Sequence, residues 1–428
     1  MKRKTLLWIF LSTSLVVLMS AGSVFAAGFA LYEGGARGLV LGAGLTGSAD
    51  DPSAVFYNPA GITQLKGIQT MIGVTAINPV MTVTTVGNFA IAATPTITGT
   101  TSRETDMEDN WFFPPHAYFT QQINDKLWWG AGIFSRFGLG TEFENSWPGR
   151  FNSTKAKINT LEFNPNIAYK INDTLSVAAG LSVMWFQANL QRQLDTRALG
   201  VGETHFELDG DSYGYGWNVA LHWKPLDWLS TGITYRSRVK QELSGDVTTS
   251  QQLRGTPVGN LISMGGEADI NLPSEVFWGV NFKVLKNLSL GGGIYWTEWS
   301  TFDQLQVRFD QPFRGSTTST TRKDWDNVFR YMIGMEWNVT NNWDLRLSYA
   351  YDEAPEPDEH VDYLLPDNDR QQFTIGCGYH NGPWLVDLAY MYIMFEDRDV
   401  TARPADYVLA GKFEGYAHLI GLSFGYKF

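Results

Sequence analysis

Basic residues recur with the spacing of one strand face in the second half of the chain. Five of them share this spacing: Arg236, Arg238, Lys240, Arg330 and Arg346. Residues two apart in an extended strand point to the same side of a sheet, so these cations would line an inward face. Such a face can bind a carboxylate through charge-assisted hydrogen bonds. We favour the alternative, in which each cation belongs to an internal charge network with Glu336, Asp344 and Asp352.

Catalytic and metal-binding patterns are missing from the sequence. The six histidines show no metal-ligand spacing, and Cys377 is the only cysteine, so no internal disulfide or thiolate cluster can form. The acidic stretch 352–369 lacks the alternating oxygen ligands and the glycine of a calcium loop. No Gly-x-Ser-x-Gly elbow or phosphate-binding loop occurs. We therefore predict no catalytic residues, no metal and no cofactor.

The first 26 residues have the three parts of a secretory signal peptide. Residues 2–4 are all basic, residues 6–19 are mostly apolar, and Val24 and Ala26 are small residues suited to the −3 and −1 positions. We predict cleavage after Ala26. The alternative is one membrane-spanning helix, which needs a longer apolar run.

The overall charge and aromatic content narrow the class of protein. The formal net charge is −12 at pH 7, so we expect no nucleic-acid partner, because phosphate backbones require Lys and Arg. Beyond the signal peptide there is no apolar stretch of about 18 residues. Aromatic residues nevertheless make up 14% of the chain. This combination fits a sheet in which alternate residues face lipid.

Apolar and polar side chains alternate from about residue 67 to the last residue. Within 343–352 the odd-numbered positions are aromatic or leucine, and the even-numbered positions are mostly polar. The stretch 416–428 alternates in the same way and ends on Phe428, with aromatic residues two and four positions earlier, which resembles the outer-membrane assembly signal. Stretches of this kind, separated by turn residues, predict about fourteen strands, the first near residue 67 and the last near residue 412.

Short and long connections alternate between these strands. Asn172-Asp173 and Asn341-Asn342 are tight turns, which we place on the periplasmic side. The longer connections are predicted to be extracellular loops: 87–108, 191–204, 248–264, 310–324, 353–369 and 397–411. An even number of strands lets the sheet close, and closure pairs every backbone group in the hydrocarbon. We therefore predict an all-β, transmembrane antiparallel β-barrel over residues 67–428.

Residues 27–66 do not follow the alternation. They are rich in Gly and Ala and carry the acidic pair Asp50-Asp51, so they cannot make good lipid-facing strands. A segment of about 40 residues is short for an independent domain. We predict that 27–66 form an N-terminal hatch, or plug, inside the lumen. The alternative is a flexible periplasmic tail.

Eight motifs follow one another along the mature chain. The first spans 50–61 and contains Asn58-Pro59-Ala60. The other seven lie at 163–170, 215–218, 234–237, 271–273, 296–300, 349–355 and 365–370. In this order they resemble the long-chain fatty acid transporter (FadL) family of outer-membrane proteins, which includes channels for aromatic hydrocarbons such as toluene. The resemblance implies a monomeric 14-stranded barrel with an N-terminal hatch and energy-independent uptake of hydrophobic molecules.

The resemblance also implies roles for individual residues. Phe29, the third residue after the predicted cleavage site, would insert into the ligand pocket. Gly138 and Gly140 would form a strand kink that opens the wall toward the membrane, since glycines let a strand bend. Arg192 and Lys323 would be the cations for a ligand carboxylate.

We therefore expect a bacterial outer-membrane channel for passive, ligand-gated uptake of hydrophobic compounds by lateral diffusion through the barrel wall. Long-chain fatty acids are the expected ligands, and aromatic hydrocarbons are the alternative on the same fold. A barrel lipid hydrolase or acyltransferase would need a Ser/His pair on the lipid face. A structural or adhesive barrel would need neither the hatch nor Phe29. The expected partners are a hydrophobic small molecule and the lipids and lipopolysaccharide of the outer membrane.

Overall fold

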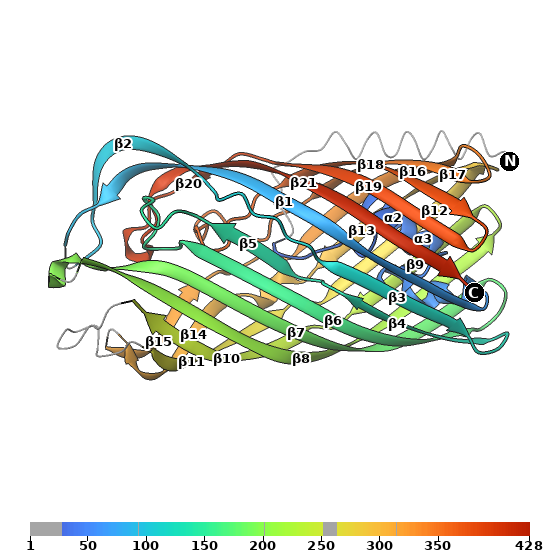
Figure 1. Cartoon of the computed structure of the whole chain (residues 1–428), viewed down its shortest axis with the longest axis horizontal. Helices are drawn as coiled ribbons and strands as arrows, with labels where there is room; N and C mark the ends of the chain where they lie inside the picture. The colour runs from blue at the N-terminus through green and yellow to red at the C-terminus, as the bar shows by residue number, and fades with distance from the viewer. Residues whose placement is uncertain (1–27, 93, 201, 251–262, 314) are drawn as a thin grey trace.

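Backbone pairing closes the β-sheet of this protein on itself (Figure 1). The computed structural model describes residues 28–92, 94–200, 202–250, 263–313 and 315–428. β1 (Ile68–Phe89) pairs antiparallel with β21 (Ala410–Lys427), from Gln69 opposite Lys427 to Val86 opposite Ala410. The sheet has 21 segments, and seven pairs of consecutive segments continue one another, so the described residues form 14 barrel strands. The predicted signal peptide, residues 1–26, lies outside the described residues.

Half of the barrel strands are interrupted along their length. The uninterrupted ones are β1, β6 (Lys155–Lys170), β7 (Leu175–Thr196), β8 (Gly202–Leu226), β17 (Trp343–Asp352), β18 (Arg370–Asn381) and β21. The interrupted ones are β2 and β3 (Ile97–Asp106, Pro115–Gln122), β4 and β5 (Leu127–Phe134, Gly138–Glu142), β9 and β10 (Leu229–Arg236, Val239–Thr249), β11 and β12 (Ser263–Leu272, Glu275–Leu285), β13 and β14 (Leu288–Thr297, Gln304–Phe313), β15 and β16 (Ser316–Arg322, Val328–Asn338), and β19 and β20 (Trp384–Phe395, Arg398–Val400). These interruptions let side chains change face along one strand.

Apolar side chains cover the outer face of the barrel. In β8 the odd-numbered residues from 213 to 223 are all exposed: Tyr213, Tyr215, Trp217, Val219, Leu221 and Trp223. Their even-numbered neighbours Asn218 and His222 are buried. A water-soluble sandwich would bury the apolar face instead, so this surface requires lipid around it. The predicted transmembrane antiparallel barrel is confirmed.

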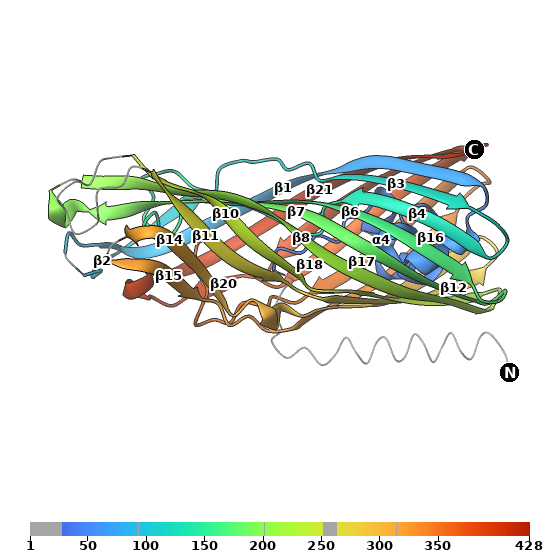
Figure 2. The same ribbon diagram turned by 90° about the horizontal axis from the view of Figure 1, so that it is seen from below.

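The two ends of the barrel differ (Figures 1 and 2). Tight turns join the strands at the end where the C-terminus lies, and long connections fill the other end. Segments 87–108 and 191–204, expected to be loops, are largely strand, because β1, β2, β7 and β8 extend beyond the lipid-facing band. Short 3-10 helices η2 (Arg197–Leu199) and η4 (Pro404–Asp406) lie in the long connections, and η3 (Trp299–Thr301) lies in the interruption between β13 and β14. Residues 251–262 of the predicted loop 248–264 lie outside the described residues.

The predicted hatch lies inside the barrel, near the end with the tight turns (Figures 1 and 2). It contains α2 (Ala36–Leu41), α3 (Ala43–Ser48), α4 (Ala54–Tyr57) and the 3-10 helix η1 (Pro59–Gln64). No helix among the described residues is long and apolar enough to cross a membrane. Almost every hatch side chain is buried, so the segment is packed as a plug and is not a free tail.

Glycines bring the backbone of α3 directly against the barrel wall. A Cβ placed on Gly279 of β12 would lie 1.7 Å from the Ala43 carbonyl oxygen. A Cβ on Gly291 of β13 would lie 2.7 Å from Gly44 Cα. Both distances are shorter than any real carbon contact, so only glycine allows this approach. Glycine at these two wall positions is therefore a packing requirement for seating α3.

We predict that Gly279→Val unseats the hatch without preventing barrel formation. The valine side chain would overlap the Ala43 carbonyl and push α3 away from β12. The purified variant should keep a heat-modifiable gel mobility, lose protease resistance in residues 28–64 and leak a small polar solute from proteoliposomes. Trp278→Leu, on the lipid-facing side of the same strand, is the control and should leave all three properties unchanged. A Gly279→Val protein as protected as the wild type would contradict this prediction.

Candidate functional site

A largely apolar cavity of about 520 Å³ lies between the first residues of the hatch and the barrel wall. Phe29 lines this cavity and is only 3% exposed. Its ring centroid is 4.6 Å from that of Trp299 and 6.0 Å from that of Phe137, both in edge-on contact. Phe302 and Trp325 complete the aromatic cluster. Phe29 is thus part of the wall of this cavity, and its role in ligand binding stays a prediction.

The cavity reaches the outer surface of the barrel through a break in the wall. β4 ends at Phe134 and β5 begins at Gly138. β5 forms a ladder with β6, and in the described chain no ladder joins its other edge to β2 or β3. Trp111 and Phe113, which are 46% and 60% exposed, also line the cavity. An apolar path therefore runs from the hatch to the lipid-facing side.

Hatch residues 28–31 occupy this break and pair with it through a single isolated bridge. Leu31 N donates to Arg136 O at 2.7 Å, and Gly138 N donates to Phe29 O at 2.9 Å. Between these bonds Ala30 and Phe137 face each other in an isolated antiparallel bridge. The hatch thereby pairs backbone groups that the broken wall leaves open, which a membrane-embedded edge requires.

Gly138 and Gly140, the predicted kink residues, are the first and third residues of β5. A Cβ on Gly138 would lie 2.9 Å from Leu31 Cδ1, and one on Gly140 would lie 1.9 Å from Phe112 Cζ. The two glycines therefore make room for Leu31 and Phe112, whose side chains fill the break from the two sides. At this point side-chain packing, and not a ladder, occupies part of the space between the strands.

Arg236, one of the predicted lumen cations, holds the hatch from inside the barrel. It is 1% exposed, and its Nη2 donates to Phe56 O at 2.6 Å and to Val55 O at 3.2 Å. These carbonyls belong to α4, which is too short to satisfy them itself. Glu162 lies 3.7 Å from the Arg236 guanidinium.

A second buried arginine completes this network. Arg136 lies 3.1 Å from Glu162 and 2.8 Å from Glu275, and all three side chains are at most 2% exposed. Arg136 was not predicted as a lumen cation, because it lies in the strand interruption, where the alternation does not indicate which way a side chain points. Two cations and two carboxylates balance here, so the network is structural.

Arg238 and Lys240 do not face the lumen, which corrects the prediction made for them. Arg236 is the last inward-facing residue of β9. The interruption at residues 237–238 shifts the alternation by one residue, so the buried side chains of β10 are the odd-numbered Val239 and Gln241. Arg238 is 56% exposed and pairs with Glu298 at 2.5 Å. Lys240 is exposed as well. A regular two-residue pattern could not have shown this shift.

Arg330 and Arg346 do face the lumen, where they contact the hatch and its supports. The Arg330 guanidinium lies 4.7 Å from the centroid of the Tyr32 ring and donates to Gln372. Arg346 lies 2.6 Å from Glu336 and 2.6 Å from Asp387. Both arginines therefore belong to the structural charge network that we favoured from the sequence.

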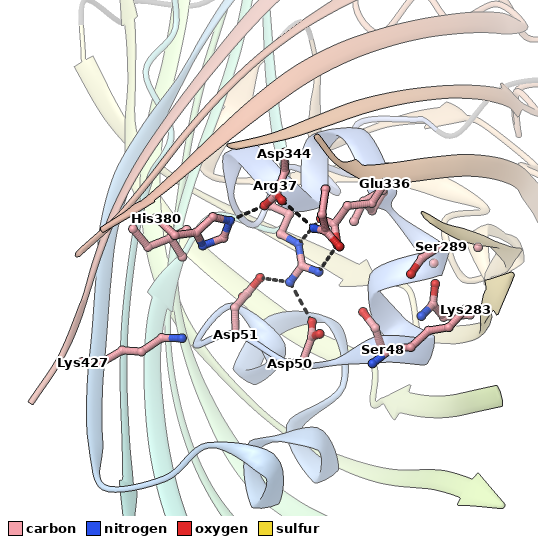
Figure 3. A pocket seen from close by; sticks show the side chains of 16 residues that line it. Arg37, Ser48, Asp50, Asp51, Lys283, Ser289, Glu336, Asp344, His380 and Lys427 are labelled. Carbon is pink, nitrogen blue, oxygen red and sulfur yellow. Dashed lines mark hydrogen bonds and ion pairs between the residues drawn. The ribbon is translucent and has the colours of Figure 1, made fainter. Parts of the chain in front are cut away.

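A polar cavity of about 260 Å³ lies at the tight-turn end of the lumen (Figure 3). Arg37 of α2 points into it and is 2.7 Å from Asp50, 2.8 Å from Asp51 and 2.8 Å from Glu336. Because Glu336 belongs to β16, Arg37 ties the hatch to the wall. Arg37 was not predicted from the sequence, since a lone arginine in a Gly-rich segment carries no pattern.

The two cations predicted to bind a carboxylate lie away from the apolar cavity. Arg192 is half-buried in β7, with its guanidinium 5.3 Å from the centroid of the Phe206 ring. Lys323 is fully buried and lies 2.7 Å from Asp362 and 3.5 Å from Glu356. Burial opposes its charge, but the two carboxylates outweigh burial and hold the pKa of Lys323 above its usual value. Neither side chain lines the cavity that contains Phe29.

The Asn58-Pro59-Ala60 motif begins η1 and anchors it to the wall. Asn58 Oδ1 accepts from Ala60 N at 3.2 Å, and Pro59 occupies the first position of the helix, where no amide donor is needed. Asn58 Nδ2 donates to Leu221 O of β8 at 3.1 Å. The motif is thus a capped turn that fixes the hatch to β8.

Neither a metal site nor an open catalytic pair is formed by the described residues. No group of three or more His, Cys, Asp or Glu side chains among them could hold a metal ion. His116 Nε2 lies 2.8 Å from Ser423 Oγ, but both side chains are buried on the lumen side and Ser423 Oγ accepts from Ala36 N. This pair holds the start of α2 in place, and because both side chains are buried it is not accessible to a lipid.

A closed barrel, an internal hatch and an apolar cavity that opens through the wall define a transport channel of the outer membrane. The chain belongs to the outer membrane protein transport protein family (OMPP1/FadL/TodX), whose model matches residues 17–428. It is 26% identical, over all of both chains, to the long-chain fatty acid transport protein of Escherichia coli O6:H1 (strain CFT073). The protein is accordingly a bacterial outer-membrane protein.

Solved structures share the fold at low sequence identity. A Pseudomonas aeruginosa FadL homologue has a TM-score of 0.78 at 20% identity, covering 94% of this chain and 99% of its own. The Ralstonia pickettii toluene transporter TbuX has a TM-score of 0.66 at 19% identity, covering 93% and 99%. Both likenesses confirm the barrel, and neither decides the ligand.

We predict that Arg236→Met destabilises the protein strongly, whereas Arg238→Met does not. The first change leaves two α4 carbonyls and part of the Glu162 charge unpaired in the interior, which costs about 3 kcal/mol or more. The second removes an exposed ion pair worth about 1 kcal/mol at most. Urea unfolding in detergent micelles, followed by tryptophan fluorescence, measures both. Equal midpoints for the two variants would refute the assigned orientations.

Proposed function

We propose that this protein is a passive channel through which uncharged hydrophobic molecules cross the outer membrane and leave sideways through the barrel wall. One observation carries the proposal: the cavity lined by Phe29 extends to exposed Trp111 and Phe113 at the break beside β5. A molecule in this cavity would have apolar contacts from the hatch to the lipid. Such a path avoids the polar end of the lumen.

Burial of apolar surface supplies the driving force for entry. Each Å² of apolar surface removed from water contributes roughly 25 cal/mol, so an aromatic-lined cavity concentrates solutes that cross the lipopolysaccharide layer slowly. The path needs no energy input, because the ligand ends in hydrocarbon, which is at least as favourable as the cavity. This supports passive, energy-independent transport by one chain acting alone.

The hatch segment 28–31 would act as the gate. It contributes Phe29 to the cavity and also fills the break through its two backbone bonds to Arg136 and Gly138. A ligand that displaces Phe29 must strain those two bonds, because both are made by the same four residues. Ligand binding and lateral opening are therefore coupled through hatch segment 28–31.

Two ligand classes are carried by proteins that this chain resembles. The curated relative named above is a long-chain fatty acid transport protein, and TbuX is a toluene transporter. A fatty acid would need a cation near its carboxylate, and the predicted cations Arg192 and Lys323 lie away from the cavity. The cations that do line the cavity are Arg370, which is paired with Asp367 at 2.7 Å, and Lys157 at the break in the wall. Because neither predicted cation is at the cavity and Arg370 is already paired, uncharged ligands are favoured over fatty acids.

Functions of other classes have less support. A lipid hydrolase or acyltransferase would need an open Ser/His pair, and the pair formed by His116 and Ser423 is sealed inside the barrel. A structural or adhesive barrel would not need an apolar cavity behind its hatch. We infer that the protein is not an enzyme and that it contacts lipopolysaccharide only as surrounding lipid.

We predict that Phe29→Ala weakens toluene binding about tenfold, while Arg192→Ala leaves it unchanged. Loss of about 50 Å² of apolar contact at roughly 25 cal/mol per Å² accounts for the first effect. Detergent-free binding to the purified protein, with toluene and oleate as competing ligands, measures this. Saturable oleate binding that weakens in Arg192→Ala would instead place a carboxylate at Arg192 and favour fatty acids.

We also predict that a disulfide across the Ala30–Phe137 bridge blocks transport reversibly. Facing residues of this kind have Cα atoms about 4.5 Å apart, within the range that a disulfide spans. In a Cys377→Ser background, the double variant Ala30→Cys/Phe137→Cys should lose uptake of a hydrophobic dye by proteoliposomes when oxidised. Reduction should restore uptake to the level of the single-cysteine controls. Unchanged uptake in the oxidised protein would exclude this segment as the gate.

A further inference from the structure

Two carboxylate side chains stand at the inner end of the apolar cavity without full hydrogen bonding. Glu33 of the hatch and Asp352 at the end of β17 both line it. Glu33 Oε2 and Asp352 Oδ1 are buried and meet no hydrogen-bond donor within the described part of the chain. A buried acceptor of this kind is costly unless a donor reaches it.

The charges around these oxygens are already negative overall. Arg330 lies 3.9 Å from Asp352, and Arg370 lines the cavity but lies 2.7 Å from Asp367. The three carboxylates of Glu33, Asp352 and Asp367 thus share two guanidinium groups. Burial raises the pKa of Glu33, because no cation is bonded to its carboxyl group. The negative charge of Glu33 is therefore present only above that raised pKa, and the exclusion of a carboxylate applies to the ionised form.

A carboxylate ligand at this end would add a further negative charge in a place shielded from water. An ionised carboxylate is only an acceptor, so it could not bond to Glu33 Oε2 or Asp352 Oδ1. A hydroxyl group, in contrast, donates one hydrogen bond and brings no charge. The chemistry of the inner end therefore matches an alcohol or phenol.

Besides Arg370, a second cation lines the cavity, beside the break in the wall. Lys157 of β6 lies opposite Gly140, beside the break in the wall, and forms no ion pair with the described residues. It is partly exposed on the outer side of the strand, since the even-numbered neighbours Ala156 and Ile158 are the buried ones. A lysine at a membrane surface commonly extends toward water, so Lys157 alone does not make a carboxylate site.

We propose that Glu33 and Asp352 form a selectivity site for the polar end of the ligand, which accepts an uncharged hydrogen-bond donor and excludes a carboxylate. The inference rests on the proposed channel function and deepens it: among uncharged hydrophobic ligands, the site favours alcohols and phenols. The apolar body of such a molecule would lie against Phe29, and its hydroxyl would reach the two free carboxylate oxygens. Arg330 and Arg370 would keep these carboxylates in place.

The test compares ligands that differ only in this group. Tryptophan fluorescence of the purified full-length protein in amphipol is titrated at pH 8 with 1-dodecanol, dodecanoate and toluene. We expect dodecanoate to bind at least about tenfold more weakly than 1-dodecanol, because an added like charge is repelled in a medium of low dielectric constant. Glu33→Gln keeps an acceptor oxygen but removes the charge. It should strengthen dodecanoate binding several-fold and leave toluene binding unchanged.

The control is Glu359→Gln, which removes the same charge from an exposed loop position and should change none of the three affinities. Dodecanoate binding as tight as that of 1-dodecanol in the wild type would overturn the selectivity site, whatever the variants do. So would dodecanoate binding that is lost in Lys157→Gln and unaffected by Glu33→Gln. If none of the three ligands binds, the channel function itself fails, and the selectivity site fails with it.

Discussion

A backbone amide or carbonyl in hydrocarbon must find a partner within the protein, and the rest of this structure depends on that requirement. β1 and β21 meet it by closing the sheet, so no edge is left along most of the wall. Residues 135–137 form one of the strand interruptions, because β4 and β5 do not join there. The hatch supplies the missing partners through Phe29 and Leu31. The same backbone bonds therefore hold the hatch in place and complete the barrel wall.

Seating of the hatch is achieved by two kinds of contact. Where the hatch touches the wall closely, glycines such as Gly44 and Gly279 remove the side chains that would hold the backbones apart. Elsewhere, charged side chains reach between hatch and wall, as Arg37 does to Glu336 and Arg236 does to the α4 carbonyls. A buried charge must be paired, so each lumen arginine is committed to a fixed partner. Cations used in this way are not available to a ligand.

This division leaves the lumen with two different environments. The tight-turn end is polar and cross-linked by the contacts of Arg37 and Arg346. The region beside the break is apolar and lined by Phe29, and it holds two carboxylates whose hydrogen bonds are incomplete. The groups that could contact a ligand are therefore gathered in the region beside the break in the wall. The same four hatch residues determine both what the cavity can hold and whether the wall is closed.

Local sequence determined much of this architecture. Alternation places the strands, because a two-residue repeat is a property of the extended backbone itself: β17 was expected over 343–352 and is found there. Turn residues such as Asn172 marked the tight connections for the same local reason. The Gly-rich, non-alternating composition of 27–66 indicated a segment that cannot face lipid, and it forms the hatch.

Only the tertiary structure decided the orientation of side chains beyond each strand interruption and the partner of each charge. Arg236 and Arg238 are two residues apart, as side chains on one face of a regular strand are. The interruption at 237–238 nevertheless turns Arg238 outward. Lys323 resembles a ligand cation in sequence, but its ammonium group donates a hydrogen bond to Asp362, which is 39 residues later in the chain. Arg37 shows no pattern at all until folding brings it to Glu336. The sequence alone determined what repeats locally along the backbone, whereas ion pairing depends on distances that exist only once the barrel has closed.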